Sequence, residues 1–178
     1  MTDRYTRTAV TLHWGMAVLV ITALGMGWIM THMRSSPLKL AVFDWHKWIG
    51  VTALALLFVR ALWRLTHPAP PLLPMPAWQR GAAQLLHGLL YAMLLVQPVT
   101  GWLYSNASGR AIVYLGLIPL PNLVGKNRAL AGTLKELHST GGWVLSIAVG
   151  LHVLAALKHH LVDRDDTLRR MLRWRTTG

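Results

Sequence analysis

Nine histidines and no cysteines limit the metal chemistry of this 178-residue chain. Without thiols, a metal centre must use histidine, methionine or oxygen ligands, which excludes iron–sulfur clusters and covalently attached c-type haem. Two of the histidines, His138 and His152, stand fourteen residues apart in one apolar segment. On an α-helix this spacing returns the side chain to within about 40° of the same face after a rise of about 21 Å. Such a helix would place one imidazole near each side of a bilayer core.

The composition indicates a membrane protein. Hydrophobic residues make up 53% of the chain and charged residues only 13%, whereas soluble domains carry about 25% charged residues. The charge is lopsided, with 18 Lys and Arg against 6 Asp and Glu. Because these charges lie between long apolar runs, we expect them to contact lipid headgroups, and we expect no nucleic-acid partner.

Four apolar segments are long enough to cross a bilayer, which needs about 20 residues. They predict an all-α fold, an integral membrane four-helix bundle that forms a single domain over residues 1–178. The expected spans cover about residues 9–33, 45–65, 81–104 and 138–161. The first is too long for a signal-peptide core and no small-residue cleavage site closes it, so we expect it to be retained.

The segments between the spans differ in character. Residues 34–44 are predicted to form a short turn, and residues 105–135 the longest loop. Five prolines between Pro68 and Pro76 predict an extended connector between the second and third spans. Four spans put both termini on one side of the membrane. That side carries 11 of the 18 Lys and Arg residues, so the positive-inside rule favours both termini in the cytoplasm.

This orientation sets the depth of each histidine. His13 and His152 are expected near the inner face, and His46 and His138 near the outer face. An imidazole within a membrane is costly unless it has a partner. A single histidine at such a depth would more often form a local hydrogen bond, but two pairs that share the fourth span are candidates for metal ligation.

Haem fits these pairs better than zinc does. Two neutral imidazoles on facing helices can hold a flat macrocycle, and a bundle interior supplies the apolar pocket that it needs. A catalytic zinc would require three protein ligands at one depth. The acidic residues near the outer ends of the spans, Asp44 and Glu136, complete no such set.

Three other histidines are interpreted as structural. His87 lies within the third span, where we expect no partner at the same depth, and His32 and His67 lie in or beside turns. His159 is different, because it follows His152 by seven residues and shares its helix face at the inner end of the fourth span. It could contact a quinone headgroup or a haem propionate, or snorkel with His160 to lipid phosphates.

Several motifs follow one another in a fixed order along nearly the whole chain. They are Arg4-Tyr5, His13-Trp14, Trp45-His46, Arg60 and Arg64 before the proline-rich run, Lys135-Glu136-Leu137-His138, Leu151-His152, His159-His160 and the tail from Asp165 to Met171. In this order they resemble the bacterial cytochrome b561 family of small dihaem proteins, which are multi-pass proteins of the inner membrane.

The resemblance implies two b haems, one held by His13 and His152 and the other by His46 and His138. Iron with two histidine ligands has no open coordination position, so it would carry electrons rather than bind oxygen. The family implies ubiquinone as a partner, with His159 at the position tied to quinone. One branch is a superoxide oxidase, an oxidoreductase in which superoxide at the periplasmic face reduces the outer haem and ubiquinone takes electrons near the inner one.

The outer loops suit an anionic donor. Their seven basic residues outweigh Asp44 and Glu136 to leave a net charge of +5, which would raise the encounter rate with superoxide. The long loop contributes four of them. These are Arg110, Lys126, Arg128 and Lys135. The same surface would attract an acidic periplasmic electron-donor protein.

Two alternatives stay open on the sequence alone. One is a cytochrome b subunit of a larger quinone-linked dehydrogenase or hydrogenase. The other is a haem-free transporter whose histidines relay protons. Proteins of that class usually need carboxylates or broken helices at mid-membrane, and this chain offers only Gln97-Pro98.

Overall fold

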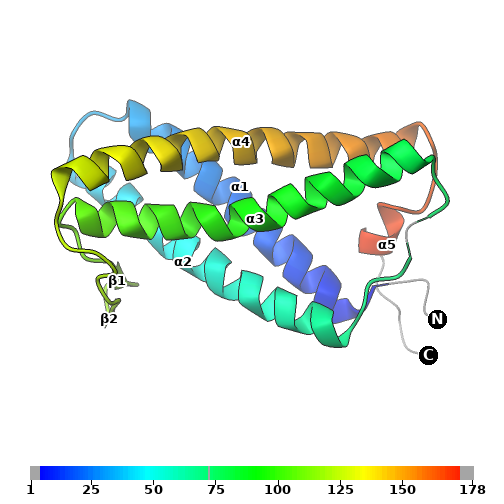
Figure 1. Cartoon of the computed structure of the whole chain (residues 1–178), viewed down its shortest axis with the longest axis horizontal. Helices are drawn as coiled ribbons and strands as arrows, with labels where there is room; N and C mark the ends of the chain where they lie inside the picture. Colours follow the sequence, from blue (N-terminus) through cyan, green and yellow to red (C-terminus); the bar gives the residue numbers. More distant parts are fainter. Residues whose placement is uncertain (1–4, 72, 173–178) are drawn as a thin grey trace.

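A computed structural model describes residues 5–71 and 73–172. Four long helices dominate it (Figure 1). They are α1 (Arg7–His32), α2 (Pro37–Thr66), α3 (Ala77–Ala107) and α4 (Arg128–Leu161). Each is long and apolar enough to cross a membrane. The all-α fold and the four spanning helices predicted from the sequence are therefore confirmed.

The four helices begin earlier than the predicted apolar segments, and polar caps set the starts of α2 and α4. Ser36 accepts a hydrogen bond from the backbone N–H of Lys39, and Pro37 occupies the first turn of α2. The prediction of a turn over residues 34–44 was therefore wrong beyond Ser36. Likewise Asn127 caps α4 by accepting from the backbone N–H of Leu130, so this helix starts ten residues before His138.

Packing between the helices is closest for α3 with α4 and for α1 with α2, and α2 also packs on α3. The start of α1 and the end of α4 lie at one end of the bundle, which we call the terminal end (Figure 1). At the opposite end, which we call the hairpin end, the chain between α3 and α4 forms two short antiparallel strands (Figure 1). These are β1 (Val113–Tyr114) and β2 (Ile118–Pro119).

The chain beyond α4 folds back over the terminal end. Arg164 adopts a positive φ of 54°, which reverses the chain direction. The short helix α5 (Arg169–Leu172) follows. The indole N–H of Trp14 donates to the carbonyl oxygen of Met171 at 2.7 Å, and Arg170 donates to the carbonyl oxygen of Pro71 at 2.9 Å. These contacts tie the tail to α1 and to the proline-rich connector.

Candidate haem sites

One pair of histidines lies toward the hairpin end. His46 of α2 and His138 of α4 have ring centroids 6.1 Å apart, with ring planes at 87°. A bond from a metal to an imidazole nitrogen is about 2 Å long, so two imidazoles on opposite sides of one metal have ring centres about 6 Å apart. The separation of His46 and His138 fits a single metal between them.

A hydrogen bond orients the His138 ring. Its Nδ1 lies 3.0 Å from the backbone carbonyl oxygen of Gln97, and because a carbonyl only accepts, the proton must be on Nδ1. The Nε2 lone pair is then available to a metal, which is the arrangement that metal-binding histidines usually show. The hydroxyl of Thr100 donates to the same carbonyl at 3.0 Å.

Glycines make room for these rings. A Cβ atom on Gly101 would lie 2.9 Å from Cε1 of His138, and one on Gly27 would lie 3.6 Å from Cε1 of His46. A Cβ atom on Gly141 would collide with the Gln97 side chain. A larger residue at Gly101 or Gly141 would therefore displace the groups that define this site.

The second pair lies toward the terminal end. His13 of α1 and His152 of α4 also have ring centroids 6.1 Å apart, with ring planes at 65°. Arg60 Nη1 lies 3.2 Å from His13 Nδ1, and because a guanidinium only donates, His13 Nδ1 must accept. This places the ring proton on Nε2. A metal bound through Nε2 would require Arg60 to release Nδ1, and Arg60 has a further contact at 3.1 Å to the hydroxyl of Tyr91.

A third imidazole adjoins this second pair. The ring centroid of His87 on α3 lies 5.3 Å from that of His152, so the prediction that His87 has no partner at its depth was wrong. His87 follows the start of α3 by ten residues and His152 precedes the end of α4 by nine, which gives them the same depth. The sequence could therefore have predicted that His87 and His152 lie at the same depth. The predicted third span began at Gly81 and not at Ala77, which misplaced His87 relative to the helix start.

Two other histidines make local contacts, as their structural interpretation predicts. The Nδ1 atom of His32 lies 2.8 Å from the carbonyl oxygen of Trp28. His67 stacks on Trp63 with centroids 3.8 Å apart and planes at 2°.

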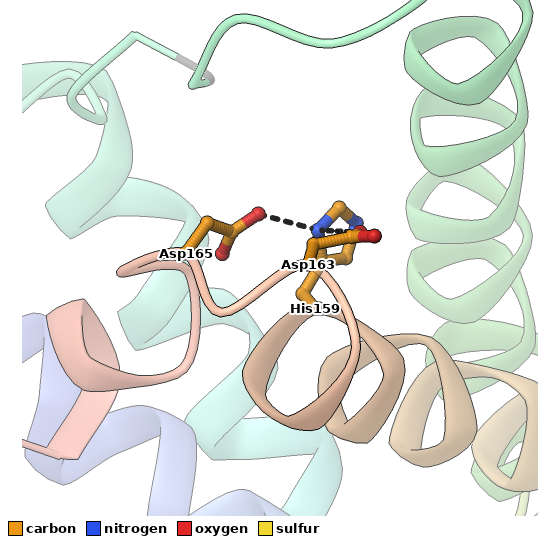
Figure 2. A group of neighbouring side chains, drawn as sticks. All are labelled: His159, Asp163 and Asp165. Atoms are coloured by element: carbon orange, nitrogen blue, oxygen red, sulfur yellow. Dashed lines mark hydrogen bonds and ion pairs between the residues drawn. The ribbon is translucent and has the colours of Figure 1, made fainter.

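His159 lies in a cluster of acidic side chains at the terminal end (Figure 2). Its Nδ1 is 2.6 Å from Oδ2 of Asp165 and 3.1 Å from Oδ2 of Asp163. Lys158 pairs with the same oxygen of Asp163 at 2.6 Å. Sequence reasoning missed both carboxylates. Asp163 could have been found, since it is four residues from His159, but Asp165 reaches the ring only because the chain turns back at Arg164.

Asp165 is held as a carboxylate. Partial burial raises its pKa, but hydrogen bonds from Thr167 and His159 outweigh this effect, and the net pKa is lower than the usual 3.8. The backbone N–H of Thr167 donates to Oδ1 of Asp165 at 2.8 Å, which leaves Oδ2 for His159. The ligand atoms of His159, Asp163 and Asp165 lie within 4.8 Å of one another, close enough for one metal ion. In this structure His159 contacts both carboxylates, and Lys158 pairs with Asp163.

Comparison with known proteins extends over almost the entire chain. Residues 4–174 match the family described as prokaryotic cytochrome b561. The chain is 32% identical to cytochrome b561 homolog 2 of Escherichia coli (strain K12), an alignment that covers 96% of this chain and 92% of the other. It is also 32% identical to the probable superoxide oxidase CybB of Yersinia pestis, over 97% of both chains.

A second relative from Escherichia coli (strain K12), cytochrome b561 homolog 1, is 31% identical over 96% of this chain and 97% of its own.

The family implies b-type haem, for which the two histidine pairs provide ligands of the required kind. With its four apolar spanning helices, this is a multi-pass protein of the bacterial inner membrane. The chain belongs to the prokaryotic cytochrome b561 family.

Proposed function

We propose that this protein is a dihaem b cytochrome that oxidises superoxide at the periplasmic face and reduces ubiquinone at the cytoplasmic face. The observation that supports it best is the presence of two histidine pairs with the same ring separation of 6.1 Å, one toward each end of the bundle. Both pairs share α4, in which their histidines are fourteen residues apart. That is a rise of about 21 Å, most of the roughly 30 Å core of a bilayer.

In this proposal His46 and His138 hold one haem, and His13 and His152 hold the other. Iron bound by two histidines supplies a reversible one-electron carrier without an open coordination position. The side chains around it set its orientation and charge. Gln97 orients His138 through the 3.0 Å contact with Nδ1. Arg60, which adjoins His13, would be the cation available to a haem propionate at this end, since a guanidinium matches a carboxylate well.

The hairpin end is assigned to the periplasm, because the terminal side has the larger share of Lys and Arg. The loop that leads into α4 still carries Arg110 and Lys126, and Arg128 is the first residue of that helix. Their positive charge would attract superoxide and increase its encounter rate. The similarity to a probable superoxide oxidase over 97% of both chains supports this choice of electron donor.

Ubiquinone is assigned to the terminal end, near His159. Because His159 bonds to Asp165 and Asp163 through Nδ1, its Nε2 is the nitrogen that can approach a quinone oxygen. The overall reaction balances when two superoxide ions each lose one electron to become O₂. Ubiquinone then gains two electrons and two protons to become ubiquinol. His159, whose ring is oriented by these carboxylates, is the group placed to pass protons at this end.

Two measurements on the purified protein test the proposal. Haem content with oxidised and reduced optical spectra should give about two b haems per chain, each low-spin. Superoxide should then reduce the haems, and added ubiquinone should reoxidise them. Two haems that superoxide does not reduce would favour the cytochrome subunit of a larger dehydrogenase or hydrogenase instead. Haem-free protein that is well folded would overturn the proposal altogether.

A further inference from the structure

The segment that carries the hairpin is unusually apolar for a loop outside the spans. Between Arg110 and Lys126 there are fifteen residues without a single charge, and ten of them are hydrophobic. Several large side chains on this segment are exposed, Leu117 to 80%. The others are Val113, Leu115, Ile118 and Leu123. Several exposed apolar side chains on one short segment are typical of contact with a membrane or another protein.

The position of the hairpin beside α2 favours the membrane. The Tyr114 hydroxyl lies 2.9 Å from the Thr52 hydroxyl, and Thr52 follows Lys47 by five residues in α2. Lys47 forms an ion pair with Asp44 at 2.6 Å, which marks the polar boundary of the span. At 1.5 Å per residue, Thr52 is about 8 Å further into the bilayer than this boundary. The side chain of Tyr114 therefore reaches a part of α2 that lies inside the span, and β1 packs against this helix.

Two tryptophans hold the segment at this level. The indole N–H of Trp48 on α2 donates to the carbonyl oxygen of Val113 at 2.8 Å. The indole N–H of Trp102 on α3 donates to the carbonyl oxygen of Pro121 at 3.2 Å. Tryptophan is enriched where apolar and polar layers of a membrane meet, so both contacts locate the segment at that boundary.

The backbone of the hairpin also suits an apolar environment, in which unpaired N–H and C=O groups are costly. The two strands pair with each other, and the N–H of Leu120 donates to the carbonyl of Ile112 at 2.9 Å. In the turn, the N–H groups of Gly116 and Leu117 donate to the carbonyls of Val113 and Tyr114. Pro119 and Pro121 carry no N–H at all.

We infer that the hairpin of residues 113–119 inserts as an interfacial segment into the leaflet at the hairpin end, which is the outer leaflet in the orientation proposed above. The hairpin is attached through Trp48 and Thr52 to α2, a helix apolar enough to cross the membrane, which is why lipid, and not a protein partner, is the occupant that we assign. Arg110 and Lys126, which flank the apolar segment, would then lie at the level of the lipid phosphates. Because Trp48 follows His46 by two residues, the membrane-bound hairpin also braces the helix turn that carries this histidine.

Site-directed spin labelling tests the inference, since the natural chain has no cysteine and each introduced one is the only labelling site. The variants are Leu117→Cys and Leu115→Cys in the hairpin, Leu154→Cys on the exposed face of α4, and Lys135→Cys at an exposed position near the hairpin end. Each haem-loaded full-length variant is placed in vesicles of phosphatidylethanolamine and phosphatidylglycerol. Power saturation then measures the collision of the nitroxide with O₂, which enters the bilayer, and with a water-soluble nickel chelate.

Labels at 117 and 115 should resemble the label at 154, with O₂ accessibility several-fold above nickel accessibility. The label at 135 should show the reverse order. Hairpin labels that match position 135 would place the segment in water and overturn the inference. Hairpin labels protected from both reagents would also overturn it, because they would show that protein covers the segment. The haem spectrum of each variant verifies that the fold is kept.

Discussion

The Nδ1 atom of His138 lies 3.0 Å from the carbonyl oxygen of Gln97, a backbone group of the neighbouring helix. This contact decides which nitrogen of His138 faces His46, whose ring centroid is 6.1 Å away. The pair toward the terminal end differs. There His13 Nδ1 accepts from the Arg60 side chain, which can move, whereas a helix carbonyl cannot. We therefore expect the site at the hairpin end to be the more rigid of the two.

The space beside His138 can be tested by adding one methyl group. In Gly101→Ala the new Cβ would lie 2.9 Å from His138 Cε1, so the ring must shift from its position opposite His46. We expect loss of one of two haems, or a changed potential for it, with a stability cost of about 1–3 kcal/mol. Gly132→Ala is the matched control, because Gly132 is an exposed position six residues before His138 and no side chain among the described residues lies within 4 Å of its Cβ. Equal haem content and potentials in both variants would contradict the proposed role of His138.

Removal of one histidine should remove one haem. His152→Ala takes away a partner of His13 and should leave about one b haem per chain, held at the hairpin end, which haem assays and difference spectra can measure. His87→Ala is the control, since the 5.3 Å between His87 and His152 is too short for ligands on opposite sides of one metal. A variant without His152 that retains both haems would show that the pairing is wrong.

The basic residues at the hairpin end should control the rate of superoxide oxidation. Replacing Lys126 and Arg128 with Gln should slow haem reduction by superoxide roughly threefold to tenfold at low salt and flatten its salt dependence, because less positive charge attracts the anion. Arg169→Gln, at the terminal end, removes a positive charge where it should not affect this rate. Stopped-flow optical measurements at two ionic strengths separate the cases. An unchanged rate at low salt would indicate a different donor.

His159 should affect ubiquinone and not superoxide. In His159→Gln, superoxide should reduce the haems at the normal rate, but their reoxidation by ubiquinone should slow roughly tenfold or more, as is typical when a proton-transfer group is lost. Asp165→Asn should have a smaller effect of the same kind, since Asp165 bonds to Nδ1 of His159. Normal ubiquinone reduction in His159→Gln would leave this histidine with a lipid-binding or structural role.

The acidic cluster also predicts how stability depends on pH. Folding lowers the pKa of Asp165 below its usual 3.8, so its carboxylate stabilises the folded protein above that pH and stops doing so as the pH falls through the folded-state pKa. Asp165→Asn should therefore lower the unfolding temperature in detergent at pH 7, and the difference from the natural protein should shrink as the pH falls below about 4. Asp166→Asn serves as the control, since Asp166 is exposed. A difference that is constant with pH would argue against this role.

The sequence was sufficient to predict the parts of the fold that depend on hydropathy. Apolar length locates the four spanning helices, because a bilayer demands a fixed number of apolar residues. The actual starts of α2 and α4 depend on Ser36 and Asn127 instead. These residues cap the first turn of each helix, and such a cap can begin a helix outside the apolar part of the membrane. Hydropathy marks the embedded part of a helix and does not mark its ends.

Side-chain neighbours were harder to predict where they depend on tertiary structure. Depth alone led to the pairs of His46 with His138 and His13 with His152. The approach of Asp165 to His159 could not be predicted, since it depends on the positive φ of Arg164, a conformation that nothing in the residue type requires. The contact of Arg60 with His13 depends in the same way on how α1 and α2 pack.

Because α4 supplies a histidine to each pair, the helix fixes both the distance and the rotation between His138 and His152. One residue inserted between His138 and His152 would turn one ring about 100° away from its partner and shift it by about 1.5 Å. Natural relatives should therefore vary freely in loop length yet keep this interval free of insertions and deletions. The spacing of two side chains thus imposes a limit on how the gene itself can change.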